Sequence, residues 1–144
     1  MLDEKPVPIS YALRIAKTYY SEETYNHAIR VMTYVAENIL IPYEYVDDCM
    51  SLAIMHDLIE DTTYPLDEDD VLGENFKNAL MLLTKDDTQS YSEYIKTIHD
   101  CTCLAYGMCA WWVKLADIKD HFAQKSTLTD KLKEKYMNVL PYLL

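Results

Sequence analysis

Glycine is unusually scarce in this chain: only 2 glycines and 5 prolines occur among its 144 residues. Multi-stranded sheets need many tight turns, and glycine and proline are prominent in those turns. Apolar residues also recur at helical spacing in most segments of the chain. The sequence therefore predicts an all-α fold, with long helices joined by short connections.

The length and composition predict one domain over residues 1–144. Half of the residues are hydrophobic, and a chain of this size buries roughly two thirds of its unfolded surface on folding. No repeat, low-complexity tract or Ser/Gly linker divides the sequence. We therefore expect a single helical bundle with one core.

Apolar periodicity and helix breakers predict where the helices lie. Pro42 is expected to stop the second helix, whose apolar face includes Ile39. Thr62–Pro65 should end the third helix, and Gly107 should form a kink or turn between the sixth and seventh. The expected helices cover about 8–20, 24–40, 45–61, 66–72, 75–84, 92–106, 108–125 and 129–143, with a loop at 85–90.

The formal net charge of -11 and the pI of about 4.6 constrain the partners. Non-specific binding to nucleic acids depends on clustered Lys and Arg, so we expect no nucleic-acid partner. A free polyphosphate would also be repelled unless a metal and a few local cations reversed the field at one site.

The N-terminal residues MLDEKPVPIS contain no apolar signal core, and no apolar run is long enough to cross a bilayer. The four cysteines lack the spacing of a zinc site. We therefore expect a cytoplasmic protein with reduced thiols and no membrane partner. The pair Trp111-Trp112 permits a homo-oligomer without requiring one.

The string HDLIEDT at 56–62 ends an otherwise apolar segment. On a continuous helix, His56 and Glu60 lie one turn apart, and so do Asp57 and Asp61. Imidazole and carboxylate together suit Mn²⁺, Fe²⁺ or Zn²⁺. The acids that follow can orient or deprotonate a water molecule.

Two further residues strengthen this interpretation. His27 lies early in the second expected helix, and Asp117 ends the apolar run VKLAD. A carboxylate on an apolar face is costly unless a cation or strong donors accompany it. The order His, His-Asp, Asp on separate helices is therefore compatible with a shared metal site.

This arrangement resembles the HD superfamily of metal-dependent phosphohydrolases. HDLIEDT, then LLTK and VKLAD, resemble more narrowly the hydrolase domain of RelA/SpoT-type (p)ppGpp hydrolases and their small stand-alone relatives, over residues 8–125. The resemblance implies that one Mn²⁺ is held by His27, His56, Asp57 and Asp117. It also implies that Glu60 and Asp61 position and activate the attacking water, and that the reaction removes the 3′-pyrophosphate of a guanosine alarmone.

Five other residues are candidates for substrate binding. In chain order, the first lies one turn after His27, the second in the TK position and the third within VKLAD. The fourth lies where the family commonly has asparagine, and the fifth matches a tyrosine of the final helix. These residues are Arg30, Lys85, Lys114, His121 and Tyr136. For Lys114 a surface position, for His121 a surface or capping position, and for Tyr136 a packing role remain open alternatives.

One segment differs from the family. Residues 19–26 are short and acidic, whereas the family usually has a basic, glycine-containing segment before the first histidine. This difference predicts weaker binding of a tetraphosphate. Three functions therefore stay open: a pyrophosphohydrolase of (p)ppGpp or a similar nucleotide, a nucleoside monophosphate phosphatase, and a non-catalytic metal- or nucleotide-binding module.

Overall fold

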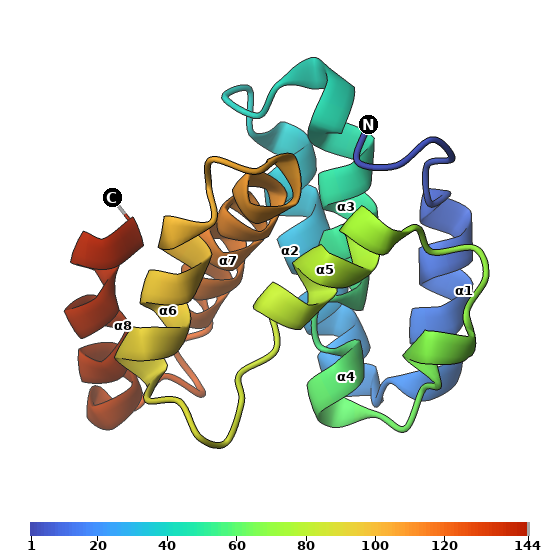
Figure 1. The fold of residues 1–144 in the computed structure, drawn as a ribbon. Coiled ribbons are helices and arrows are strands. Elements are labelled where there is room, and N and C mark those ends of the chain that lie inside the picture. The colour runs from blue at the N-terminus through green and yellow to red at the C-terminus, as the bar shows by residue number, and fades with distance from the viewer. Residues whose placement is uncertain (144) are drawn as a thin grey trace.

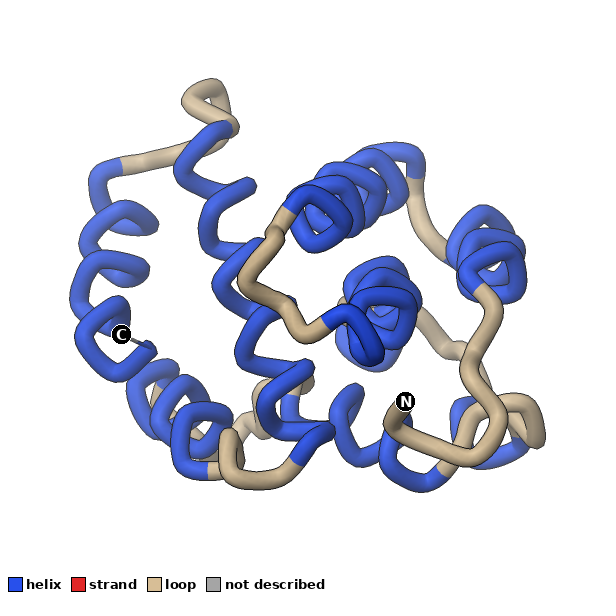
Figure 2. Tube along the Cα trace, turned by 90° about the horizontal axis from the view of Figure 1, so that it is seen from above, coloured by secondary structure: helices blue, strands red, loops and turns tan. Residues whose placement is uncertain are grey.

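The computed structural model describes residues 1–143, and every regular element in that range is helical. Figure 2 shows these helices and the loops that join them. The all-α prediction is thus confirmed. The α-helices are α1 (Ile9–Tyr19), α2 (Glu22–Glu37), α3 (Val46–Met55), α4 (Leu58–Asp61), α5 (Glu74–Leu82), α6 (Tyr91–Asp100), α7 (Ala105–Ala123) and α8 (Asp130–Leu143).

Helix α3 forms the centre of the core. It packs against α1, α2, α5 and α7, and Figure 1 shows α1 on one side of the molecule and α6 and α8 on the other. The residues from Ser51 to Met55 are completely buried. A helix that is apolar on nearly all sides needs such a position, and its C-terminal end is thereby held inside the protein.

The predicted helix over 45–61 is not continuous. A 3-10 turn covers Tyr43–Tyr45, α3 ends at Met55, and α4 begins at Leu58. Side chains bind carbonyls of the last turn of α3: His56 Nδ1 contacts the carbonyl of Ala53, and the Tyr20 hydroxyl donates to Ile54 at 2.7 Å. The turn at 56–57 is the local structure from which the HD motif projects.

The end of α2 also differs from the prediction. The helix stops at Glu37, before Pro42, and Asn38 is extended. Ile39 is 95% exposed, so its predicted place on the apolar face is wrong. The apolar period continued past the true end of the helix, and only the backbone geometry at Asn38 reveals the difference.

Gly107 lies inside α7, because the turn that separates α6 from α7 covers 101–104 instead. A Cβ atom at this position would lie 1.9 Å from the carbonyl oxygen of Cys101. The glycine therefore permits a close approach of two backbones. The predicted helix at 66–72 is likewise wrong, since only a 3-10 turn at Leu66–Glu68 forms there.

Helix α7 carries polar side chains into the interior. Lys114, Asp117 and Asp120 are all buried, and their spacing of three residues places them on one face. That face is turned toward α2 and α3, against which α7 packs. Asp117 and Asp120 contact His27 of α2, and Lys114 bonds Asp117.

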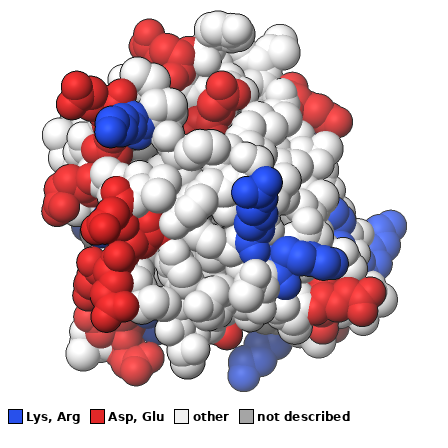
Figure 3. All heavy atoms as spheres, turned by 90° about the vertical axis from the view of Figure 1, so that its right-hand side faces the viewer, with Lys and Arg blue, Asp and Glu red and all other residues white. Residues whose placement is uncertain are grey.

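The surface reflects the acidic composition. Figure 3 shows acidic side chains gathered along one edge of the face on the α1 side, with a basic side chain among them and further Lys and Arg side chains toward the opposite edge. Within residues 1–143, none of the helices combines the length and apolarity that crossing a membrane requires.

Candidate metal centre

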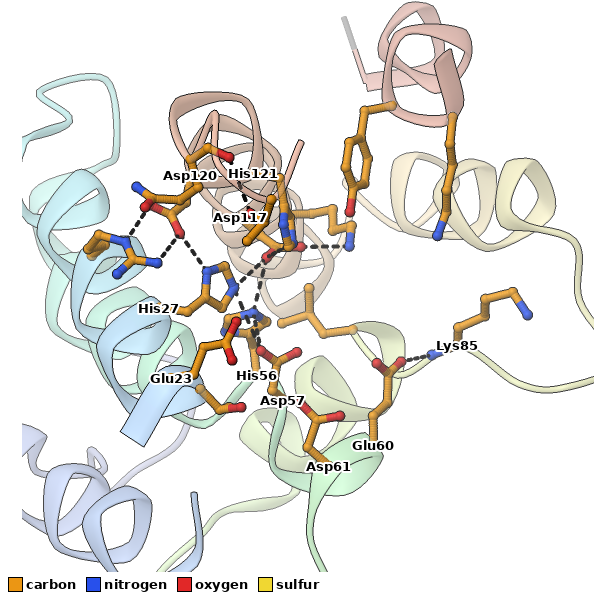
Figure 4. Close-up of a pocket in the computed structure, with 18 of the residues that line it drawn as sticks. Glu23, His27, His56, Asp57, Glu60, Asp61, Lys85, Asp117, Asp120 and His121 are labelled. Carbon is orange, nitrogen blue, oxygen red and sulfur yellow. Dashed lines mark hydrogen bonds and ion pairs between the residues drawn. The ribbon is translucent and has the colours of Figure 1, made fainter. Parts of the chain in front are cut away.

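A cavity of about 360 Å³ lies where the 56–57 turn meets α2, α7 and α8. All eleven residues that the sequence suggested as ligands, catalytic groups or substrate contacts line it. Figure 4 shows His27, His56 and Asp57 together at its centre, with Asp117 above them. Residues up to 109 positions apart in the sequence are thus brought into one site.

The four expected metal ligands lie within a few ångströms of one another. His27 Nε2 is 2.8 Å from Asp117 Oδ1 and 3.7 Å from Asp57 Oδ2. His56 Nε2 is 3.2 Å from Asp57 Oδ2 and 3.3 Å from Asp117 Oδ1. Two nitrogen and two carboxylate donors therefore surround one small volume.

His56 has an unusual environment. Its side chain is 3% exposed, its Nδ1 bonds the carbonyl of Ala53, and its Nε2 has no hydrogen-bond partner among the described residues. With a proton on Nδ1, Nε2 is the nitrogen that faces the carboxylates, and it can bind a cation there once it has lost its own proton. A buried polar atom without a partner is costly, and a cation between the donors satisfies it. The residues present therefore fit a divalent metal.

His27 is oriented from behind by a second carboxylate. Its Nδ1 lies 2.6 Å from Asp120 Oδ2, which fixes the proton on Nδ1 and leaves Nε2 for the cavity. Arg30 donates from Nε to Asp120 Oδ1 at 2.8 Å and from Nη2 to Asp120 Oδ2 at 3.1 Å. Arg30 thus contacts the site through Asp120, although it was suggested as a substrate contact.

Asp117 is held by Lys114. The ammonium donates to Asp117 Oδ2 at 2.8 Å, so that Oδ1 is the oxygen that faces the histidines. Burial alone raises the pKa of Asp117, but Lys114 and the surrounding imidazoles outweigh it and hold that pKa well below its ordinary value. The side chain of Lys114 is 10% exposed, so the alternative of a surface lysine is wrong.

Both histidines at the centre hold protons more tightly than a free imidazole. Burial lowers the pKa of His56, yet Asp57 and Asp117 more than compensate and raise it to about 9. Burial lowers the pKa of His27, but the contacts with Asp117 and Asp120 together outweigh it, so that this pKa is raised as well. The carboxylates therefore strongly favour a positive charge at His27 and His56.

Glu60 and Asp61 lie at the mouth of the cavity, beside Asp57 (Figure 4). Glu60 Oε1 accepts a hydrogen bond of 2.6 Å from the backbone N–H of Lys85. This bond ties α4 to the loop after α5. The pKa of Asp61 is raised by partial burial and by the neighbouring Asp57 and Glu60.

His121 lies closer to the centre than a surface or capping histidine would. Its Nε2 is 3.2 Å from Asp117 Oδ1, and with His27 and Asp117 it forms a second group whose ligand atoms lie within 4.8 Å of one another. Its ring stacks on that of Tyr136, with centroids 5.0 Å apart. Tyr136 is buried, and its ring contacts those of Tyr91 in α6 and Phe122 in α7.

Asp120 and Lys135 belong to the site, although the sequence did not suggest them. Asp120 follows Asp117 by three positions on the same helix face, and this spacing was the available signal. Lys135 precedes Tyr136 and lines the cavity; nothing in the local sequence distinguishes it from the neighbouring lysines of α8.

No protein-family model matches this chain, and no curated protein is significantly similar to it.

Proposed function

We propose that this protein is a metal-dependent hydrolase of a phosphorylated nucleotide, with His27, His56, Asp57 and Asp117 holding one divalent cation, most suitably Mn²⁺. The observation that carries the proposal is the buried Nε2 of His56, which has no hydrogen-bond partner within residues 1–143 and faces two carboxylates. When bound, such a cation supplies Lewis acidity to a phosphoryl group and lowers the pKa of a water molecule.

The resemblance to the alarmone-hydrolase branch of the HD superfamily supports a reaction at the 3′-pyrophosphate of (p)ppGpp or a similar nucleotide. In this proposal Glu60 and Asp61 orient the attacking water and accept its proton. Their position at the cavity mouth is compatible with that role. Asp120 and Lys114 do not bind the cation in this proposal. They fix the orientation of His27 and Asp117, respectively.

A second activity, hydrolysis of nucleoside monophosphates, is favoured by one observation. Glu23 lines the cavity beside His27, where the family usually places cations. An acid at that position repels a substrate that carries many phosphates. The released product separates the two activities, since one yields pyrophosphate and the other yields phosphate.

The test is a substrate screen with Mn²⁺ in which phosphate and pyrophosphate are both measured. We expect pyrophosphate from ppGpp, no turnover by Asp57→Ala, and normal turnover by Asp100→Ala, a matched control on an exposed carboxylate outside the cavity. Phosphate release from nucleoside monophosphates alone assigns the second activity. If no nucleotide is hydrolysed while Mn²⁺ still binds, the protein is a binding module and the enzymatic proposal is wrong.

A further inference from the structure

One side of the cavity is cationic. In Figure 4, Lys85 lies beside Glu60, on the side of the histidines opposite to Glu23. Lys114 and Lys135 also line the cavity. These three lysines, which we call the lysine wall, come from three different segments: the loop after α5, helix α7 and helix α8.

An aromatic ring holds two of these ammonium groups. Lys135 Nζ lies 4.3 Å from the ring centroid of Tyr91, and Lys114 Nζ lies 5.6 Å from the same centroid. Tyr91 is the first residue of α6, and its ring also contacts that of Tyr136. Cation–π contacts of this kind favour one position of a flexible lysine side chain, so Lys114 and Lys135 are positioned before a ligand arrives, while the ammonium of Lys85 bonds the carbonyl of Asp86 at 3.2 Å.

The lysine wall has more positive charge than its neighbours neutralise. Four of the 13 Lys and Arg residues of this acidic chain line this cavity. Arg30 and Lys114 are paired with Asp120 and Asp117. Within residues 1–143, neither Lys85 nor Lys135 is paired with a carboxylate at ion-pair distance.

The surroundings of Lys135 agree with this excess of charge. Partial burial lowers the pKa of Lys135, and the nearby ammonium groups of Lys114 and Lys85 lower it further. An anion placed between these side chains relieves the repulsion among them. A phosphate group is the biological anion that suits several lysines at once, because its oxygens can each accept a charge-assisted hydrogen bond.

We propose that Lys85 and Lys135 form a second anion subsite, which binds a phosphate-bearing group of the substrate that is not hydrolysed. Lys114, already bound to Asp117, connects this subsite to the metal centre. The inference rests on the proposed function. Such a subsite favours nucleotides that carry phosphate at two separate positions. A cavity of about 360 Å³ is within the range of small-ligand sites.

The test measures binding of inorganic pyrophosphate to the whole protein by calorimetry, with a chelator present. The variant Lys135→Gln is compared with Lys133→Gln, which removes the same charge from an exposed position of α8 outside the cavity. We expect Lys135→Gln and Lys85→Gln each to weaken binding about tenfold and Lys133→Gln to change it by less than about twofold. Unchanged thermal melting of the variants establishes that they fold.

The outcomes separate this subsite from the metal centre. Equal effects of Lys135→Gln and Lys133→Gln, or no binding of pyrophosphate by the wild type, overturn the subsite whatever the catalytic activity is. Pyrophosphate binding that depends on Lys135, in a protein that hydrolyses no nucleotide with Mn²⁺, supports the subsite and overturns the enzymatic proposal instead. In an active protein, Lys135→Gln should raise KM more for doubly phosphorylated nucleotides than for monophosphates.

Discussion

Replacing Asp120 by asparagine tests whether His27 is held as a metal ligand. Asp120 accepts from His27 Nδ1 at 2.6 Å and from Arg30 Nε at 2.8 Å. An asparagine has one acceptor and one donor. If its oxygen faces Arg30, its amino group faces Nδ1, which must then lose its proton to Nε2, and Nε2 can no longer bind a metal. If the amide turns round, its amino group opposes the guanidinium.

Either orientation of the amide weakens the site by a predictable amount. Loss of a group that orients a ligand histidine typically reduces metal affinity roughly 10- to 100-fold, equivalent to about 1.4–2.7 kcal/mol. Isothermal calorimetry with Mn²⁺ measures this directly. Arg30→Met is the matched control, because it keeps the carboxylate against His27 and removes only the half-exposed guanidinium; its effect should be smaller. Wild-type affinity in Asp120→Asn would refute the orientation of His27 described above.

Three other perturbations test the fold that supports the site. Tyr20→Phe leaves the Ile54 carbonyl without its 2.7 Å donor and should lower the free energy of unfolding by about 1–3 kcal/mol in urea titrations. Gly107→Ala raises helix propensity, yet its Cβ would lie 1.9 Å from the carbonyl of Cys101; we expect a lower melting temperature, and a higher one would contradict this close approach. Hydrogen bonds from two tyrosine hydroxyls and two backbone amides outweigh burial and lower the pKa of Asp69. Its carboxylate therefore stabilises the fold at pH values above the unfolded pKa of about 3.9. Asp69→Asn should therefore destabilise the protein at pH 7 and less at pH 3, and an equal effect at both would contradict the assignment.

Local sequence was sufficient for most of the helices and for the strings that carry the candidate ligands. The period of apolar residues reflects burial on one face, and this signal is strong in α1, α2 and α6. It failed where a tertiary contact decides the backbone. The Tyr20 hydroxyl, 34 residues from the Ile54 carbonyl, helps hold the end of α3, and no local pattern encodes that contact.

Gly107 and Asp120 illustrate the same limit. A glycine inside an apolar run indicates a turn by its propensity, but here it admits the neighbouring backbone of Cys101 within a helix. Asp120 gains its role from His27, which lies 93 residues away. The sequence can nominate such residues by helical spacing, whereas their partners are defined only once the helices are packed.

The charges of the cavity divide it into two parts. Arg30 neutralises Asp120, and Lys114 neutralises Asp117. Of the remaining carboxylates, Asp57 lies next to the two histidines, Glu60 and Asp61 lie beside it, and Glu23 lies beside His27. This part retains excess negative charge, while the lysine wall retains excess positive charge. A substrate that bridges a cation at Asp57 and the lysine wall would balance both excesses, whereas a nucleoside monophosphate would leave one of them unbalanced.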